Sequence, residues 1–293
     1  MAPAAASAGG SEVLFADDLS AFKKFALDVA TDDVIEDLQR CRREVHRWGN
    51  RNRVVFDAGK EHLAIIHPSR GFGNSFKLLG CMIDVKLHMD EAIDLVVAQA
   101  RPKIKAMLRT RGIYSHSAMF IQYKTHIWGI TEYCNGAILH ASNTALGKLE
   151  RLQRSFVHEM HITEEVAFVD HGLAPPSLRR DIGILGFLHK RVLGQAHTGI
   201  EQLLPMIGAC PPWHDKQIES HMQECIRQQV IFYRSLFGMV LVYNRLPQAF
   251  VNIDSVQSFQ SALTHVARTS CLAGSAGWRS MFRRKGSVPT PTD

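Results

Sequence analysis

The sequence predicts an α+β protein, with short strands and one helix up to about residue 88 and a long, mainly helical region after it. Three observations predict this class. Short apolar runs separated by polar or glycine-containing turns dominate the first 88 residues, which is typical of β-hairpins. Within that region, apolar residues recur at helical spacing only between Asp33 and Gly49. From Asp90 onward, helical spacing is the prevailing pattern, and no internal repeat is visible.

The composition is that of a soluble globular protein with a mildly basic balance. The 293 residues are 46% hydrophobic and 21% charged, the formal net charge is +6 and the pI is near 9.1. This balance is compatible with a nucleic-acid partner without requiring one. The positive charge is uneven, because residues 40–53 carry six arginines against one acid and residues 101–111 carry five cations and no acid.

The cysteines and the hydropathy pattern concern the compartment. Six cysteines are scattered without a Cys-x-x-Cys spacing, and no signal peptide precedes them. No apolar run approaches the roughly 20 residues that span a bilayer. We therefore expect a reduced intracellular protein, the nucleus included, with no membrane partner.

The first 88 residues predict two hairpins around one helix. Residues 1–11 are small and featureless, and the apolar runs on either side of Asp17-Asp18 indicate a hairpin. Asp33, with Glu36 in the capping-box position, predicts a helix start, and Gly49 predicts its end. Residues 53–56 and 63–66 are β-type runs, and residues 76–83 favour a further hairpin.

The remaining chain predicts a series of helices. Apolar stripes indicate helices from Asp90 to Leu108, with a bend at Pro102, and from Leu146 to Met160. Ser177 is a candidate cap for the next helix, and a further helix is expected from His214 to Tyr243. The predicted segments are a leader (1–11), a strand-rich region (12–88), two helical regions (89–200 and 201–278) and a disordered tail (279–293).

The aspartate pair is the first motif that could carry chemistry. Two-metal nucleotidyl transfer needs rigid carboxylates that hold two ions about 4 Å apart, and a turn between strands exposes such groups. Asp17 and Asp18 would fit that role. Aspartate is also an ordinary turn residue, and the pair alone fits that reading better.

Two further features are weak when taken singly. Lys60 follows a β-type run and Gly59, where a lysine could touch a triphosphate and protonate the leaving pyrophosphate. It could equally be a solvated surface lysine. The segment from Phe76 to Gly80 could simply be a buried hairpin.

In order and spacing, these motifs together resemble the last palm motifs of non-LTR (LINE-type) retrotransposon reverse transcriptases. Phe15-Ala16-Asp17-Asp18 looks like the family's Tyr/Phe-x-Asp-Asp box, and Phe76 to Asp84 is similar to its primer-grip segment. Downstream similarities are Gln99-Ala100-Arg101, Glu132-Tyr133, Leu152-Gln153-Arg154 and the stretch from Leu173 to Arg180. The resemblance covers roughly residues 12–200.

The resemblance implies a partial palm followed by a helical thumb, and an RNA-directed DNA polymerase that binds an RNA or DNA template–primer. It implies Asp17 and Asp18 as catalytic ligands of Mg²⁺ and Lys60 as a third catalytic residue. The primer grip would comprise Phe76, Lys77, Leu78, Leu79 and Gly80. The thumb would contact nucleic acid through Arg101, Lys103, Lys105, Arg109 and Arg111.

The family's fingers and its first catalytic aspartate precede the Asp-Asp box, and the fourteen residues before Phe15 hold one acid, Glu12. We therefore expect the chain alone to be inactive, with an upstream part of the polyprotein as a further partner. Primer extension on poly-rA/oligo-dT that is lost in Asp17→Ala would contradict this.

Other interpretations stay open. The cations of residues 101–111 could be a solvated helix face as readily as a phosphate-binding one. The histidine pairs 158/161, 189/197 and 214/221 could be imagined as zinc ligands with Cys210 and Cys225, but they match no recognised spacing and fit core-edge or surface positions better. The alternative function is a non-catalytic helical nucleic-acid-binding or scaffold protein derived from such an element. An unrelated α-rich domain with a chance Asp-Asp turn is the third possibility.

Overall fold

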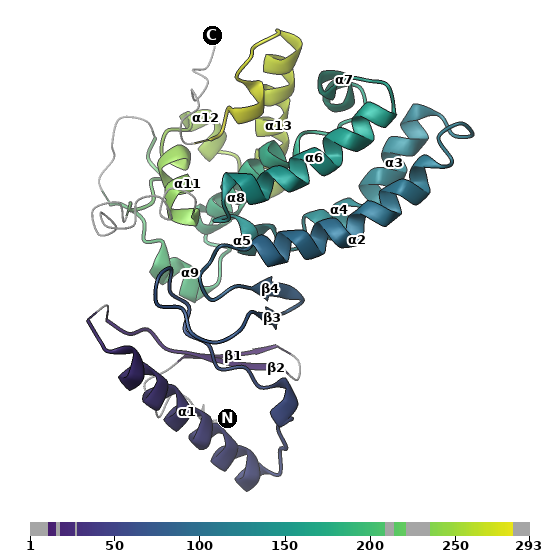
Figure 1. The fold of residues 1–293 in the computed structure, drawn as a ribbon. Helices are drawn as coiled ribbons and strands as arrows, with labels where there is room; N and C mark the ends of the chain where they lie inside the picture. The colour runs from purple at the N-terminus through teal and green to yellow at the C-terminus, as the bar shows by residue number, and fades with distance from the viewer. Residues whose placement is uncertain (1–10, 16–17, 27, 209–213, 221–234, 284–293) are drawn as a thin grey trace. The chain divides into compact units, whose positions relative to one another are not determined.

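The computed structural model describes residues 11–15, 18–26, 28–208, 214–220 and 235–283. It confirms an α+β protein that is mainly helical (Figure 1). The chain forms two compact units, one of residues up to Phe76 together with Asp84–Leu87, the other of Lys77–Ile83 and the residues from His88 onward.

The first unit begins with the predicted hairpin. Strands β1 (Ser11–Phe15) and β2 (Asp18–Phe22) pair antiparallel, from Ser11 opposite Phe22 to Phe15 opposite Asp18. The aspartate box therefore spans the closing pair of this hairpin. Ala16 and Asp17 lie outside the described residues.

Helix α1 (Thr31–Asn52) is longer at both ends than the sequence predicts. It begins after Ala30 without a side-chain cap, so the expected cap at Asp33 is wrong. It runs past Gly49 and ends at Arg53, whose φ of 57° is left-handed. Gly49 serves a different purpose, because a Cβ there would lie 2.6 Å from the Phe56 ring and 2.8 Å from the Val54 carbonyl oxygen.

The β-type runs at residues 53–56 and 63–66 are not strands. The backbone N–H of Val54 bonds to the Gly49 carbonyl and so completes the end of α1. Val55 is 93% exposed and has no face to bury. Asp57 then accepts a hydrogen bond from the Gly59 N–H and starts the 3-10 turn η2 (Ala58–Lys60). Ile65 forms only an isolated bridge, to Phe72.

The second predicted hairpin is present. Strands β3 (Phe76–Leu78) and β4 (Cys81–Ile83) form a two-stranded sheet, and Leu79 and Gly80 connect them with φ of 48° and 82°. Positive φ at both central residues is what a tight two-residue hairpin loop requires. Glycine adopts it readily, whereas leucine does so with strain.

The second unit is built from helices. Most of the predicted helices exist; α2 has the predicted bounds, whereas the ends of others, such as α6, differ from the expected ones. The described helices are α2 (Asp90–Leu108), α3 (His116–His126), α4 (Trp128–Thr131), α5 (Asn135–Ile138), α6 (Asn143–Glu159), α7 (Glu164–Val169), α8 (Pro176–Val192), α9 (Thr198–Leu203), α11 (Leu236–Tyr243), α12 (Gln248–Val251), α13 (Val256–Leu272) and the 3-10 turn η5 (Trp278–Ser280).

Three apolar clusters hold these helices together. The first lies between α2 and α6, where Ile93 and Leu149 are buried, and the second surrounds Phe120 and Phe156. In the third, α13 packs on α8 around fully buried Leu185. Full burial of such a side chain contributes about 1.5–3 kcal/mol, so the clusters explain why the predicted stripes became helices.

Several details of the second unit differ from the sequence expectation. Helix α8 begins with Pro176 at its first position, where proline is favoured, and Ser177 does not cap it. Residues 214–220 are not helical, and within the expected helix from His214 to Tyr243 the described helical part is α11. Phe282, which we placed in the tail, is buried.

Two observations concern the cysteines and the hydropathy of the helices. Cys81 and Cys134 form a disulfide with their Cα atoms 5.7 Å apart, contrary to the expectation of reduced cysteines; both belong to the second unit. Cys210 and Cys225 lie outside the described residues. Within the described part of the chain, no helix is both long and apolar enough to cross a membrane.

Candidate nucleic-acid interface

The structure describes two of the three residues expected to be catalytic, Asp18 and Lys60. Asp17 lies outside the described residues, and the structure places the backbone of Asp18 at the start of β2. Lys60 ends η2 with its side chain 86% exposed. Within the described residues its ion pair is with Asp57, 3.9 Å from its Nζ atom. The described residues include no group of three His, Cys, Asp or Glu side chains that could hold a metal.

The primer-grip segment is an exposed hairpin tip tied to the helical unit. Lys77, Leu78, Leu79 and Gly80 are all exposed. The Tyr133 hydroxyl donates a hydrogen bond to the Leu79 carbonyl oxygen at 2.7 Å. Next to these two residues, Cys81 and Cys134 form the disulfide. This hydrogen bond and the nearby disulfide therefore hold a strained turn in which Leu78 and Leu79 are exposed to solvent.

The basic end of α2 is as the sequence predicts. Ile104 and Met107 are buried against the neighbouring helices, which turns the cations outward. The helix continues through Pro102, which is exposed like Ala98, so the carbonyl that loses its partner can bond to water. Among described residues the one ion pair of this group is a long contact of 3.9 Å between Arg111 and Glu159. The five exposed cations are Arg101, Lys103, Lys105, Arg109 and Arg111.

Three of the downstream family-like segments meet at one guanidinium. Arg179 on α8 pairs with Glu132 and donates from Nη1 to the Gln153 side-chain oxygen at 2.8 Å. Gln153 Nε2 donates to the Ala174 carbonyl oxygen at 3.0 Å, and Arg179 also reaches that oxygen. The Arg179 guanidinium lies over the Trp128 ring, 4.8 Å from its centre. These motifs are thus explained by packing of the second unit.

Buried charges lie near this junction. Burial raises the pKa of Asp181 to about 6 against the opposing effect of Arg283 and Arg180, and the Arg283 Nε atom is 3.6 Å from Asp181 Oδ2. Burial also raises the pKa of Glu150, opposed by Arg180. Arg180 is itself buried, which lowers its pKa. This cluster joins α6, α8 and the end of the described chain.

Two of the candidate zinc-binding histidines, His189 and His214, are buried in the second unit and form hydrogen-bonding contacts there. His189 is fully buried, its Nδ1 lies 2.9 Å from the Tyr243 hydroxyl, and its ring stacks on Phe259 at 4.1 Å. His214 Nε2 lies 3.2 Å from the Tyr243 carbonyl oxygen. Burial lowers the pKa of both histidines. They stabilise the second unit in their neutral form.

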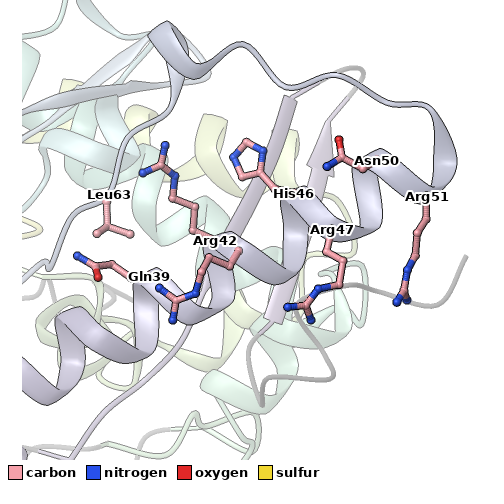
Figure 2. A pocket seen from close by; sticks show the side chains of 8 residues that line it. Gln39, Arg42, His46, Arg47, Asn50, Arg51 and Leu63 are labelled. Atoms are coloured by element: carbon pink, nitrogen blue, oxygen red, sulfur yellow. The ribbon is translucent and has the colours of Figure 1, made fainter.

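The structure adds one surface that the site prediction missed. Along α1, two adjoining rows of side chains line an open groove of about 810 Å³, which we call the arginine groove (Figure 2). Leu63 lies at its edge. The arginine run was visible in the sequence, but its arrangement as one groove depends on the fold of residues 53–63 beside the helix. One row is Gln39, Arg42, His46 and Asn50, and the other is Arg43, Arg47 and Arg51.

The two rows differ in whether their positive charges are paired with acids. Arg42 Nε lies 2.7 Å from Glu61 Oε2, and His46 Nε2 lies 2.6 Å from Glu61 Oε1. Arg43, Arg47 and Arg51 are exposed and form no ion pair with a described residue. One row is therefore partly neutralised, and the other consists of guanidinium groups that form no ion pair with a described residue.

Comparison of the chain with protein-family models, with curated proteins and with solved structures finds no match.

Proposed function

We propose that this chain is the part of a non-LTR retroelement reverse transcriptase that carries the end of the palm and the thumb, and that it holds a template–primer. The succession of elements supports the proposal. Phe15 and Asp18, the first and last residues of the aspartate box, pair in a hairpin; a helix, a second hairpin with the primer-grip motif and a basic helix follow. This is the succession that the family resemblance implies.

The observation that carries the proposal is the row of cations on α2. Arg101, Lys105 and Arg109 recur every four residues, so they share a face about 12 Å long at 1.5 Å rise per residue. The opposite face is buried, which fixes the row in position. Cations that form no ion pair with a described acid, along a rigid helix, suit the phosphates of a duplex, whose neutralisation releases counterions.

The hairpin tip adds a contact of another kind. Leu78 and Leu79 project from a turn that Tyr133 and the disulfide keep in place, so they could press on the sugar face of a primer end. Mg²⁺ enters through the resemblance, with Asp17 and Asp18 as its carboxylate ligands and phosphate or water completing its shell. Holding the duplex through α2 does not depend on the metal.

The test is binding of a labelled blunt RNA–DNA duplex, measured by fluorescence anisotropy at low salt. Lys105→Glu/Arg109→Glu should weaken binding by roughly tenfold or more, because two phosphate contacts become repulsions. The matched control is Lys190→Glu/Arg245→Glu, which makes the same charge change at exposed positions outside α2. Unchanged binding in the α2 variant, or an equal loss in the control, would contradict the proposal.

A further inference from the structure

The arginine groove on α1 has no role in the proposed function. We propose that it binds the phosphate backbone of a single-stranded nucleic acid, such as an unpaired template segment. The inference takes only one thing from the proposed function, namely that the ligand is a nucleic acid. Its surface, its residues and its probe are different, and it lies wholly within the first unit.

The first argument is the charge of the row formed by Arg43, Arg47 and Arg51. On an exposed helix, arginines commonly have acidic residues three or four positions away. The neighbours of Arg47 at four residues are Arg43 and Arg51, and like charges at that spacing destabilise a helix. Glu44 lies three residues before Arg47 but forms no ion pair with it. None of the three pairs with a described acid. An anion along the row would remove this repulsion.

The second argument is geometry. Side chains four residues apart on a helix are separated by about 6 Å along its axis, which is close to the separation of successive phosphates in an extended strand. Each guanidinium can bind two phosphate oxygens through its fork of N–H groups. Figure 2 shows Arg47 and Arg51 leaving α1 on the same side, so one strand could follow both.

The third argument is the adjoining row of α1 together with Leu63, which favours an unpaired strand over a duplex or an acidic peptide. Gln39 and Asn50 bear amides that can both donate and accept hydrogen bonds, and Leu63 adds an apolar edge. Amides of this kind pair with base edges, which are free in a single strand. Arg42 and His46 both pair with Glu61, so their row carries less net positive charge than the row of Arg43, Arg47 and Arg51.

The experiment compares two nucleic-acid probes on the full chain, a fluorescein-labelled oligouridylate and a blunt RNA–DNA duplex, and uses labelled polyglutamate as an acidic-peptide probe. The test variant is Arg43→Gln/Arg47→Gln/Arg51→Gln, which removes three charges and keeps good helix-forming residues. The matched control, Lys86→Gln/Lys190→Gln/Arg245→Gln, removes three charges at exposed positions outside the groove. Circular dichroism and the urea midpoint check that each variant is folded.

We expect the groove variant to lose roughly tenfold or more in oligouridylate affinity, with the control and the duplex affinity nearly unchanged. The slope of log K against log salt for the oligouridylate should fall by about 2, since each single-strand phosphate contributes about 0.7. Relief of like-charge repulsion should keep the urea midpoint at or above that of the wild type.

Three outcomes would overturn the inference. The first is a folded groove variant whose oligouridylate affinity is unchanged. The second is an equal loss of affinity for oligouridylate and duplex. The third is a wild-type chain that binds polyglutamate but not oligouridylate, with the polyglutamate binding abolished in the groove variant. Failure of the proposed function is distinguishable, because the α2 variant Lys105→Glu/Arg109→Glu is scored on the duplex. If that variant binds duplex normally while the groove variant loses the single strand, the inference stands and the thumb assignment fails.

Discussion

Arg179 and Gln153 are joined by a hydrogen bond of 2.8 Å from the guanidinium Nη1 to the amide oxygen, and this contact links α8 to α6. The same guanidinium pairs with Glu132, and Gln153 bonds in turn to the Ala174 carbonyl. One arginine therefore connects three segments that are far apart in the sequence.

Truncation of this arginine should destabilise the chain strongly. Arg179→Ala leaves the Glu132 carboxylate without its pair and the Gln153 amide oxygen without its donor. Breaking a buried pair from one side costs about 3–5 kcal/mol, and the partial exposure of Glu132 places the expected loss near the lower value. Urea unfolding followed by circular dichroism measures it.

Arg154→Ala is the matched control, because Arg154 is 61% exposed and pairs with Glu164 at 3.4 Å on the surface. Its expected effect is below about 1 kcal/mol. Arg179→Lys should recover only part of the lost stability, since one ammonium cannot reproduce the planar fork. Equal effects of the two alanine substitutions would show that the Arg179 network does not stabilise the fold.

Asp181 should make stability depend on pH. Burial raises its pKa to about 6 from an ordinary value of 3.8, so the folded chain holds this proton more tightly than the unfolded chain. The stability contributed by this group is therefore complete below about pH 4 and is lost as the pH rises through about 6. The loss is on the order of 3 kcal/mol, since one pH unit per proton corresponds to about 1.4 kcal/mol.

Asp181→Asn keeps the neutral amide at all pH values and should remove this dependence. Urea unfolding of both proteins between pH 4 and 7 gives the difference in unfolding free energy, from which titrations common to both cancel. Relative to the variant, the wild type should lose stability as the pH rises. A difference that is flat with pH would contradict the role of Asp181.

The disulfide should be a main support of the hairpin tip. Cys81 and Cys134 are separated by 53 positions, and closing a loop of that length stabilises a fold by about 4 kcal/mol in the chain-entropy treatment. Dithiothreitol should therefore lower the urea midpoint of the wild type. Cys81→Ala/Cys134→Ala should start at the lower midpoint and not respond to the reductant. A wild-type midpoint that dithiothreitol leaves unchanged would show that the bond is absent or without consequence.

Replacement of Leu79 should raise the stability of the chain and weaken its binding to a primer. Its φ of 48° is unfavourable for leucine, and Asn tolerates this region better, so Leu79→Asn should stabilise the chain by about 1 kcal/mol. Under the proposed function it should also weaken primer binding, because an exposed apolar contact is lost. Leu78→Asn is the control, since Leu78 is similarly exposed but lies in extended β3 and should bring no gain in stability. Anisotropy and urea unfolding measure the two effects separately.

The sequence predicted what depends on local periodicity. The apolar stripe through Ile93, Ile104 and Met107 lies on α2 as predicted. A surface helix buries one apolar face, and this face can be recognised from the helical repeat without knowing which element covers it. Residues 53–56 failed as a strand because strand pairing needs a partner, and Val54 was already bonded to Gly49. Contacts between distant segments, such as that of Arg179 with Glu132, leave no periodic trace and could not be predicted.

The candidate site shows the same division. The cations of α2 were predictable as one face, since Arg101, Lys105 and Arg109 need only the helical repeat to align. The arginine groove was missed although its arginines follow the same repeat, because a groove needs a second wall. Leu63 supplies that wall, and Glu61, two residues earlier, pairs with Arg42 on α1; neither contact could be predicted from the sequence.

The salt dependence of duplex binding gives the sharpest measure of how many α2 cations touch phosphate. Each phosphate contact contributes about 0.9 to the slope of log K against log salt on a duplex. Lys105→Gln/Arg109→Gln should therefore reduce that slope by about 2 and weaken binding most at low salt. Lys190→Gln/Arg245→Gln should leave the slope unchanged, since these residues lie outside α2. A slope that falls equally in both variants would indicate a diffuse effect of net charge, and the α2 row would lose its assignment as the duplex-binding face.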